Sequence, residues 1–413
     1  SKLNIVIRTK NLSVISQTVK EQGSKVIPQP EDLAAIIYTS GTTSKPKGVM
    51  LTHYNIAAQT TIIPPLFEYN ENDVLLSILP LAHTYECTLG MIYPFSRGAR
   101  IHYLDRPPTA SALMPALAQV RPTVIASVPL IIEKIYRGKV LPTFQKKAIL
   151  RKLYSWDWSR KLLHKVAGKQ LKELFGGRMR FFAIGGAKFD SEAERFLLEA
   201  GFPYGIGYGL TETAPLLAGA VGKMVRVGST GPSLEGVELR LDNINPSTGQ
   251  GEIVAKTPCC MSGYYKNEEA TKAVLEDDGW LHTGDMGIMD PDGTIYIKGR
   301  CKTMILTDTG QNIYPEQIED KLNNMPLVLE SLVLENEGKL YGLVVPDFDH
   351  CEKEGIDRAQ LEDIMKENLK NLNEQVAAYE RLVSIAIHTS EFEKTPKRSI
   401  KRYLYDVKRL GIK

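Results

Sequence analysis

The feature that most constrains the fold is an alternation of short apolar runs with helical patterns through the first half of the chain. The apolar runs are rich in branched residues and are typical of strands: LAAIIYTS, DVLLSILPL, ARIHYLD, TVIASVP and MRFFAIGG. Between them, TASALMPALAQV and SEAERFLLEAG have the spacing of helices. Strands alternating with helices predict an α/β domain, in which helices cover a largely parallel sheet.

The pattern changes twice further along, and each change predicts a new structural unit. From about residue 222 to residue 300, short strands alternate with Gly-rich turns, which favours a small β subdomain. Beyond it we expect a strand pair around NEGK, a polar helix near residues 357–380 and a strand in LVSIAIHTS, an α+β arrangement. Because 413 residues exceed one ordinary core, we expect an N-terminal domain over residues 1–300 and a C-terminal domain over residues 303–413.

Composition restricts the partners and the compartment. The net charge of +3 is too small to indicate a nucleic-acid-binding protein. Five cysteines, an odd number in a long chain, are typical of reduced thiols, and no apolar run reaches the roughly 18 residues of a transmembrane helix. The start, SKLNIVIRTKN, lacks the apolar core of a signal peptide. These observations favour a cytoplasmic protein without a nucleic-acid partner.

Positive charge is concentrated in residues 134–180, which hold 14 Lys or Arg residues against two acidic ones. Within this basic region, WSRKLLHKVAGKQLKELF spaces its apolar residues roughly as one face of a helix; they are Trp158, Leu162, Leu163, Val166, Leu171 and Phe175. One interpretation is a solvated helix packed on the core by this face. The other is a basic amphipathic surface that makes peripheral contact with an anionic membrane.

The strongest local signal is YTSGTTSKPKGV, directly after an apolar run. Gly41 and Gly48 allow the backbone to curl, hydroxyls and backbone amides can donate to one anion, and Lys45 and Lys47 add positive charge. This combination suits a polyphosphate. The stretch is not a Walker A loop, because the Gly-Lys-Ser/Thr ending is absent. Taken alone, it could equally be a flexible surface loop.

Two further stretches supply groups that a nucleotide requires. GYGLTET offers Tyr208 as a flat stacking surface, Thr211 as a hydroxyl donor and Glu212 as a carboxylate for a hard cation. HTGD ends at Asp285, whose carboxylate suits the two hydroxyls of a ribose. Singly, Asp285 would be interpreted as a turn residue and Glu212 as a surface carboxylate. Together and in this order, the three stretches are a specific signal.

These motifs resemble those of the adenylate-forming (AMP-binding, ANL) superfamily, which contains acyl-CoA synthetases, luciferases and the adenylation domains of peptide synthetases. The resemblance covers essentially the whole chain, through YTSGTTSKPKGV, GYGLTET, WLHTGD and GRCKTMILTDTGQNIYPEQIE. It is closest to long-chain fatty acid CoA ligases, through LPLAHTYE, VPLIIEKIY, FGGRMRFFAIGGA and GQNIYPEQIE. The family fold is a large N-terminal domain followed by a small mobile C-terminal one, which implies a hinge near residues 300–303.

The resemblance also implies roles for individual residues. Those implied to bind the pyrophosphate-side phosphates are Thr39, Ser40, Gly41, Thr42, Thr43 and Lys47. Those implied to line the adenine and the α-phosphate are Gly186, Ala187, Gly207, Tyr208, Gly209 and Thr211. Thr39 and Glu212 would lie near Mg²⁺.

The remaining roles concern the sugar, the hinge and the acyl group. Asp285 would hold the ribose, Arg300 would assist it, and Lys302 would be the pivot between two domain orientations. His83 of LPLAHTYE matches a residue of the family's acyl-pocket wall. A lone histidine beside an apolar strand is more often simply packed.

The implied reaction activates a fatty acid, of medium to long chain, with ATP. Its carboxylate attacks the α-phosphorus, pyrophosphate leaves, and Mg²⁺, Thr211 and a lysine meet the charge that develops on the phosphate. The C-terminal domain then rotates, and the thiol of CoA displaces AMP to form a thioester. Two alternatives stay open: transfer to an acyl carrier protein, and a catalytically weakened acyl- or nucleotide-binding protein.

The start of the chain departs from the family pattern. Only 37 residues precede Tyr38, far fewer than in the family. We therefore expect either a fragment or a sheet that is partly supplied from elsewhere.

The tail, EFEKTPKRSIKRY, departs from the pattern as well. Its alignment to the family is anchored on Thr395, Ile400 and Arg402. This alignment puts Ser399 at the position of the lysine that contacts the α-phosphate during adenylation, and a serine cannot supply that charge. Either Lys397 or Lys401, two residues away on each side, substitutes for it, or adenylation is slow.

Overall fold

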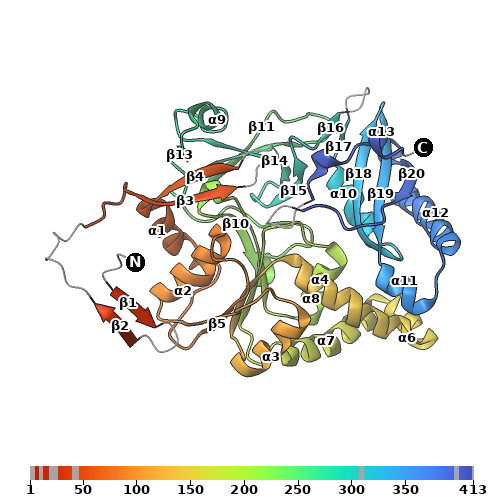
Figure 1. The fold of residues 1–413 in the computed structure, drawn as a ribbon, viewed down its shortest axis with the longest axis horizontal. Helices are drawn as coiled ribbons and strands as arrows, with labels where there is room; N and C mark the ends of the chain where they lie inside the picture. The colour runs from red at the N-terminus through yellow and green to blue at the C-terminus, as the bar shows by residue number, and fades with distance from the viewer. Residues whose placement is uncertain are drawn as a thin grey trace.

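The computed structural model describes residues 5–8, 13–17, 27–39, 46–306, 311–394 and 400–411. Its centre is a six-stranded sheet with the order β10-β9-β8-β7-β5-β6 (Figure 1). Neighbouring strands are parallel except β10, which runs antiparallel to β9. The strands are β5 (Val74–Ser77), β6 (Arg100–Tyr103), β7 (Val124–Ser127), β8 (Phe181–Ile184), β9 (Tyr204–Gly209) and β10 (Leu216–Val221).

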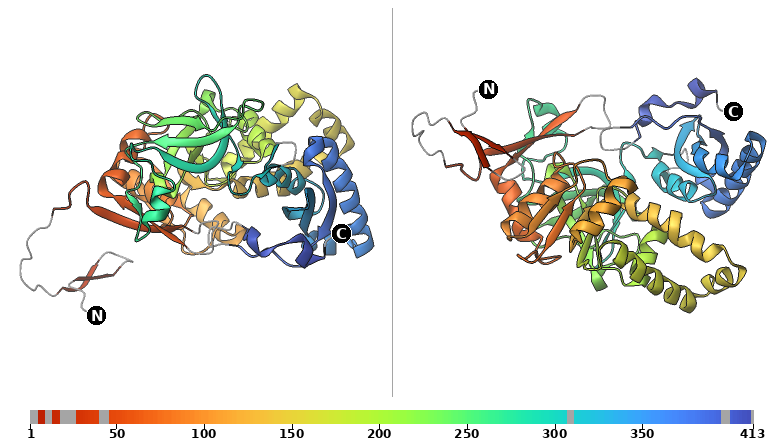
Figure 2. Two further views of the ribbon diagram at one scale, coloured as in Figure 1. Left: turned by 90° about the horizontal axis from the view of Figure 1, so that it is seen from above. Right: turned by 60° about the horizontal axis from the view of Figure 1, so that its bottom comes forward.

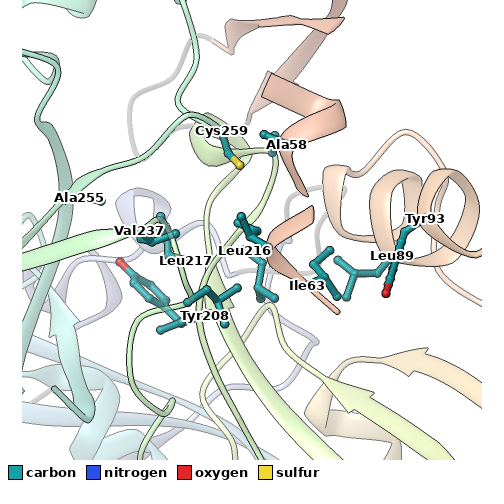
Figure 3. Packing of buried hydrophobic residues seen from close by; sticks show 14 of the residues in the cluster. Ala58, Ile63, Leu89, Tyr93, Tyr208, Leu216, Leu217, Val237, Ala255 and Cys259 are labelled. Carbon is teal, nitrogen blue, oxygen red and sulfur yellow. The ribbon is translucent and has the colours of Figure 1, made fainter. Parts of the chain in front are cut away.

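Each face of this sheet packs against its own hydrophobic cluster, because successive strand residues point to opposite sides. Leu75 and Val124 belong to one cluster, whereas Leu76 and Ile125 belong to the other. The first cluster, part of which Figure 3 shows, includes residues of α1 (His53–Ile62), the π-helix η1 (Glu86–Ile92) and α2 (Tyr93–Ser96). The second includes residues of α3 (Ala110–Val120), α4 (Pro129–Ile135), α7 (Asp157–Leu174) and α8 (Ser191–Ala200).

The segment between α4 and β8 extends away from the sheet. It contains η2 (Tyr136–Val140), α5 (Leu141–Gln145) and α6 (Ala148–Tyr154), followed by α7. In the right-hand view of Figure 2 this yellow segment forms a helical arm that projects beyond the rest of the N-terminal region.

Three antiparallel sheets complete the N-terminal region. One contains β11 (Glu238–Asp242), β12 (Gly251–Lys256), β14 (Leu281–Met289) and β15 (Ile295–Arg300). Another has the order β13-β4-β3, from β3 (Leu33–Thr39), β4 (Lys47–Thr52) and β13 (Gly263–Tyr264), and α9 (Glu268–Lys272) follows β13. The third pairs β1 (Ile5–Arg8) with β2 (Ser13–Gln17).

One predicted strand lies in a different sheet from the one expected. LAAIIYTS was expected in the parallel sheet, but it forms β3, which pairs antiparallel with β4. The reason is the short connection, because β3 ends at Thr39 and β4 begins at Lys47, whereas a parallel crossover needs about a dozen residues or more. The other four apolar runs contain β5, β6, β7 and β8, and their prediction is confirmed.

The described residues after β15 form a second, small unit, drawn mostly in blue in Figure 1. A sheet of β18 (Val328–Asn336), β19 (Lys339–Pro346) and β20 (Leu382–Ile387) packs against α10 (Pro315–Asn323) and α12 (Arg358–Gln375). The predicted pair around NEGK is confirmed, since Glu337 and Gly338 form its turn with φ of +53° and +73°. The shorter elements are β16 (Ile305–Leu306), β17 (Asn312–Ile313), α11 (Phe348–Glu354) and α13 (Val407–Leu410).

The chain is therefore an α/β protein with a large N-terminal domain, built on a mostly parallel sheet, followed by a small C-terminal domain. Among the residues described, no helix combines the length and the apolar character needed to cross a bilayer.

Candidate active site

The carboxyl ends of β8 and β9 place two glycine-containing stretches side by side. The two strands pair in parallel, with Ile184 opposite Ile206. Gly186 and Ala187, just after β8, are therefore neighbours of the second half of β9, and both are exposed. Gly186 has φ +83°, a conformation that favours glycine. Ligands of open α/β sheets bind outside the carboxyl ends of the strands, so this edge is the candidate site.

The end of β9 packs tightly against the turn that follows it. A Cβ on Gly209 would lie 1.9 Å from the carbonyl oxygen of Pro215, and one on Gly207 would lie 2.7 Å from Leu216 Cδ1. Only glycine fits at Gly209, because backbone cannot move aside as a side chain can. The turn is the 3₁₀ helix η3 (Thr211–Thr213), which carries Thr211 buried and Glu212 half-buried.

Gln59, on α1, holds this turn in place. Its side-chain amide is fully buried and donates hydrogen bonds to the carbonyl oxygens of Thr213 (2.9 Å) and Leu216 (3.1 Å). The sequence analysis missed Gln59, because a single polar residue in a helix gives no signal of a partner about 150 residues away. Its contribution is to position Thr211 and Glu212.

Tyr208 and Asp285 join two motifs that are distant in sequence. The Tyr208 hydroxyl donates to Asp285 Oδ2 over 2.8 Å, and Arg300 Nε lies 2.9 Å from Asp285 Oδ1. Asp285 is not a turn residue: it lies within β14, opposite Arg300 on β15, and is only 5% exposed. Burial raises the pKa of Asp285, although Arg300 and Tyr208 act against this rise. The ring of Tyr208 packs within the cluster of Figure 3.

Glu212 is linked to Lys47 through Tyr264. The Tyr264 hydroxyl donates to Glu212 Oε1 over 2.9 Å, and Lys47 Nζ lies 4.6 Å from the centre of the Tyr264 ring. Burial, together with the charge of Glu212, raises the pKa of the Tyr264 hydroxyl, which is therefore a donor at neutral pH. Tyr264 was also missed, because only the pairing of β13 with β4 brings it here.

The hairpin β3–β4 carries the ends of the predicted phosphate loop. Thr39 and Lys47 face each other as the last pair of this hairpin, and Thr39 is 9% exposed. The Thr39 hydroxyl lies 3.5 Å from the carbonyl oxygen of Lys47. The remaining predicted residues of this loop, Ser40, Gly41, Thr42 and Thr43, lie outside the described residues.

His83 lies in the connection between β5 and η1, beside the same edge of the sheet. Its carbonyl oxygen accepts from the backbone of Cys87 over 2.9 Å, and the side chain is half-buried. The neighbouring Tyr85 hydroxyl donates to the carbonyl oxygen of Ser127, at the end of β7, over 3.3 Å. Glu86 is fully buried, and burial raises its pKa to about 7.

Of the predicted lysines near the hinge and in the tail, Lys302 and Lys401 lie apart from these contacts. Lys302 is exposed in the turn after β15. Lys401 Nζ lies 3.2 Å from Glu393 Oε2, an ion pair within the C-terminal domain. Lys397 and Ser399 lie outside the described residues.

The segment after β8 also contacts the C-terminal domain. Lys188 forms an ion pair with Asp320 on α10. The Asn324 side chain donates to Asp190 Oδ2 over 2.6 Å, and Arg137 donates to the carbonyl oxygen of Asn323 over 2.9 Å. The two domains therefore meet immediately beside Gly186 and Ala187.

Fold and site define an α/β protein with its polar site at the carboxyl edge of a parallel sheet, a class with many nucleotide-binding members. The family model described as "AMP-binding enzyme" matches residues 3–265, and the one described as "AMP-binding enzyme C-terminal domain" matches residues 302–406. The chain belongs to the AMP-binding enzyme family.

Several named relatives are similar over most of the chain. The peroxisomal long chain acyl-CoA synthetase 6 of Arabidopsis thaliana is 33% identical over 321 residues, which is 71% of this chain and 44% of that protein. Long-chain-fatty-acid–CoA ligase 4 of Saccharomyces cerevisiae is 30% identical over 364 residues, 83% of this chain and 52% of that protein. The chain thus spans about half the length of the curated relatives it matches.

Solved structures share the fold. ATP-bound MatB from Rhodopseudomonas palustris has a TM-score of 0.71 and 26% identity, over 93% of this chain and 69% of that one. O-succinylbenzoate coenzyme A synthetase (MenE) from Bacillus subtilis, in complex with ATP and magnesium ion, has a TM-score of 0.69 and 23% identity, over 94% of this chain and 74% of that one.

Proposed function

We propose that this chain carries out the ATP-dependent activation of a fatty acid to acyl-AMP, followed by transfer of the acyl group to CoA. One observation carries the proposal: both ends of the GYGLTET stretch are tied to other predicted motifs. Tyr208 bonds Asp285, and Glu212 is linked through Tyr264 to Lys47. Three segments distant in sequence thus bring two carboxylates, Asp285 and Glu212, and one cation, Lys47, to one edge of the sheet. A nucleoside triphosphate with its metal ion requires such groups.

In this proposal the nucleotide lies across the ends of β8 and β9. The carboxylate of Asp285 accepts hydrogen bonds from the ribose hydroxyls, and Arg300 keeps it ionised and oriented. Gly186 and Ala187, with residues 207–211, form the edge along the adenine and the α-phosphate. Thr39 to Thr43 and Lys47 meet the two outer phosphates.

Glu212 and Thr39 are the proposed residues near Mg²⁺. The ion prefers oxygen ligands, and Tyr264 occupies only Oε1 of Glu212, so the carboxylate has a second oxygen to offer. When bound, Mg²⁺ would neutralise charge on the phosphates as it develops.

The chemistry needs a nucleophile, a leaving group and a cation. The fatty acid carboxylate oxygen bonds to the α-phosphorus, the bond to the pyrophosphate oxygen breaks, and acyl-AMP remains. Thr211 donates to the α-phosphate, and Lys401 or Lys397 supplies the charge that Ser399 cannot. Lys401 would first have to leave Glu393.

The second half-reaction uses another orientation of the C-terminal domain, about a hinge near residues 300–303 with Lys302 as its pivot. The thiol of CoA attacks the acyl carbon, AMP leaves, and a thioester forms. We place the N-terminal domain at residues 1–300, including its β subdomain, and the C-terminal domain at residues 303–413.

A fatty acid is the proposed acid because the relatives named above are long-chain acyl-CoA synthetases and ligases. His83, beside the candidate site, is the proposed contributor to the acyl-pocket wall. An acyl carrier protein in place of CoA is the alternative acceptor, and Ser399 supports the further alternative of a weakened acyl- or nucleotide-binding protein.

A pyrophosphate-release assay with a panel of fatty acids tests the proposal. Release that depends on a fatty acid, with CoA consumed, is the expected result. Consumption of acyl carrier protein alone would change the acceptor. AMP binding without any pyrophosphate release would overturn the catalytic role.

A further inference from the structure

Helix α7 presents an unusual pair of rows to solvent. Trp158, Leu162 and Val166, spaced four residues apart, are 66%, 58% and 54% exposed. A second row with the same spacing is also exposed and consists of Lys161, Lys165 and Lys169. Because residues four apart lie above one another on a helix, the apolar row and the lysine row run side by side along one face.

This arrangement corrects the expectation of a single apolar face packed on the core. Leu171 is buried in α7, and Phe175 is buried just after it. The buried side of the helix also includes His164, which bonds Glu199 on α8 over 2.8 Å. Trp158, Leu162 and Val166 point the other way, so their apolar character is not used in folding.

The segment that precedes α7, which includes α6, also exposes apolar side chains. Ile149 is 75% exposed, and Trp156, between α6 and α7, is 47% exposed. The rings of Trp156 and Trp158 stack with their centres 6.4 Å apart. The same segment contains the exposed cations Lys146, Lys147, Arg151 and Lys152.

The charge of this segment is predominantly positive. Residues 146–169 contain eight Lys or Arg residues and a single acidic residue, Asp157. Asp157 lies 2.8 Å from Arg160 and 3.5 Å from Lys161, so it is already paired. The lysines beside the apolar row therefore face solvent, and this segment offers little negative charge to pair with them.

We propose that this face of α6 and α7, residues 146–169, binds peripherally to a membrane that contains anionic lipid. Exposed tryptophan and aliphatic side chains lie at the boundary of the acyl chains, while flanking lysines reach the headgroups. An acidic protein could pair with the lysines but would not account for the exposed apolar row. The helical arm projects from the molecule in Figure 2, so a flat bilayer can reach it.

The test is co-sedimentation of the whole chain with vesicles of phosphatidylcholine containing phosphatidylserine, compared with phosphatidylcholine alone, at low and high salt. Binding is expected only to the anionic vesicles and is expected to weaken with salt. Lys165→Glu with Lys169→Glu should weaken it by at least about tenfold. Trp158→Ser should also weaken it, and the tryptophan emission of the unmodified protein should shift to the blue with vesicles.

The matched control reverses two lysines with the same spacing on α12, Lys366→Glu with Lys370→Glu. It makes the same change in net charge and should leave vesicle binding unchanged. Absence of binding at low salt, or equal loss in both double variants, would overturn the proposal. The proposal would also be overturned if Lys165 and Lys169 mediated binding to an acyl carrier protein, or self-association, while the protein did not bind vesicles. Thermal unfolding of each variant is followed by circular dichroism. An unchanged unfolding curve shows that a loss of binding is not caused by misfolding.

Discussion

Asp285 shows how burial and pairing prepare a single carboxylate. The group is 5% exposed and receives Tyr208 on one oxygen and Arg300 on the other. Its orientation is therefore fixed before any ligand arrives. A fixed acceptor loses less conformational freedom on binding than a mobile one, which favours tight and specific contact with a pair of hydroxyls.

Replacing this carboxylate tests its proposed role. Asp285→Asn keeps the shape but removes the charge, and we expect kcat/KM for pyrophosphate release to fall about ten- to a hundredfold. The matched control is Asp290→Asn, at the end of the same sheet, where Asp290 pairs with Arg226. A loss of the same size in the control would contradict a specific role for Asp285.

Glu86 differs from Asp285, because burial of its ionised carboxyl group reduces the stability of the folded state. Burial raises its pKa to about 7. Its folded pKa lies above the unfolded value near 4.5, so the folded state is relatively most stable below that value. Stability is lost as the pH rises from about 4.5 through 7.

Glu86→Gln removes this dependence. We expect the variant to be more stable than the unmodified protein at pH 8, by on the order of 3 kcal/mol, and to differ little near pH 4. Thermal unfolding followed by circular dichroism at both pH values measures the difference. An equal effect at the two values would show that ionisation of Glu86 is not its cause.

At the scale of elements, the short strand β13 has a large role. Its pairing with β4 puts Tyr264 between Lys47 and Glu212, and so aligns the phosphate hairpin with the turn after β9. The phosphate hairpin and the turn after β9, which are far apart in sequence, are thereby held in a fixed relative position.

Tyr264→Phe removes the hydroxyl that orients Glu212 but keeps the ring below Lys47. We expect a loss of about tenfold in kcat/KM and a need for more Mg²⁺, measured as pyrophosphate release over a range of Mg²⁺ concentrations. Tyr265→Phe, the adjacent and more exposed residue, serves as the control. If both variants respond alike, the link from Tyr264 to Glu212 has no part in the reaction.

Elements with a strong local pattern could be predicted from the sequence, whereas those defined by distant partners could not. β5, β7 and β8 follow from buried apolar runs, and the NEGK turn follows from local chemistry. β6 was predicted from a similar run, although most of its residues are exposed. β3 has an equally apolar run, but its sheet depends on β4 and β13, which no local pattern reveals. Helix α7 was predicted as a helix, yet helical spacing could not tell its buried side from its exposed one.

The same distinction holds for the site. Tyr208, Glu212 and Asp285 lie in recognisable motifs, and the structure brings these motifs together. Gln59 and Tyr264 lie in segments whose composition is ordinary. Their importance comes from hydrogen bonds across about 150 and 50 residues of sequence.

At the scale of the whole molecule, the two domains meet through polar contacts. Lys188, Asp190 and Arg137 on one side contact Asp320, Asn323 and Asn324 on the other. Polar interfaces of this kind can open without exposing a hydrophobic core, which suits the proposed change of orientation.

Charge reversal at this interface tests its role. Lys188→Glu should repel Asp320 and shift the C-terminal domain, which small-angle scattering would record as a larger radius of gyration. Adding Asp320→Lys restores the pair with opposite polarity and should restore the profile. An unchanged profile in the single variant would mean that this ion pair does not hold the orientation.

Gly186, Ala187 and Lys188 are consecutive, and this adjacency has a thermodynamic consequence. Two of them border the proposed nucleotide position and the third bonds the other domain. A ligand that immobilises the first two would restrict the third, so the proposed nucleotide site and the domain orientation would be coupled through a single tripeptide. Such coupling is reciprocal: an orientation favoured by the nucleotide also strengthens nucleotide binding by the same factor.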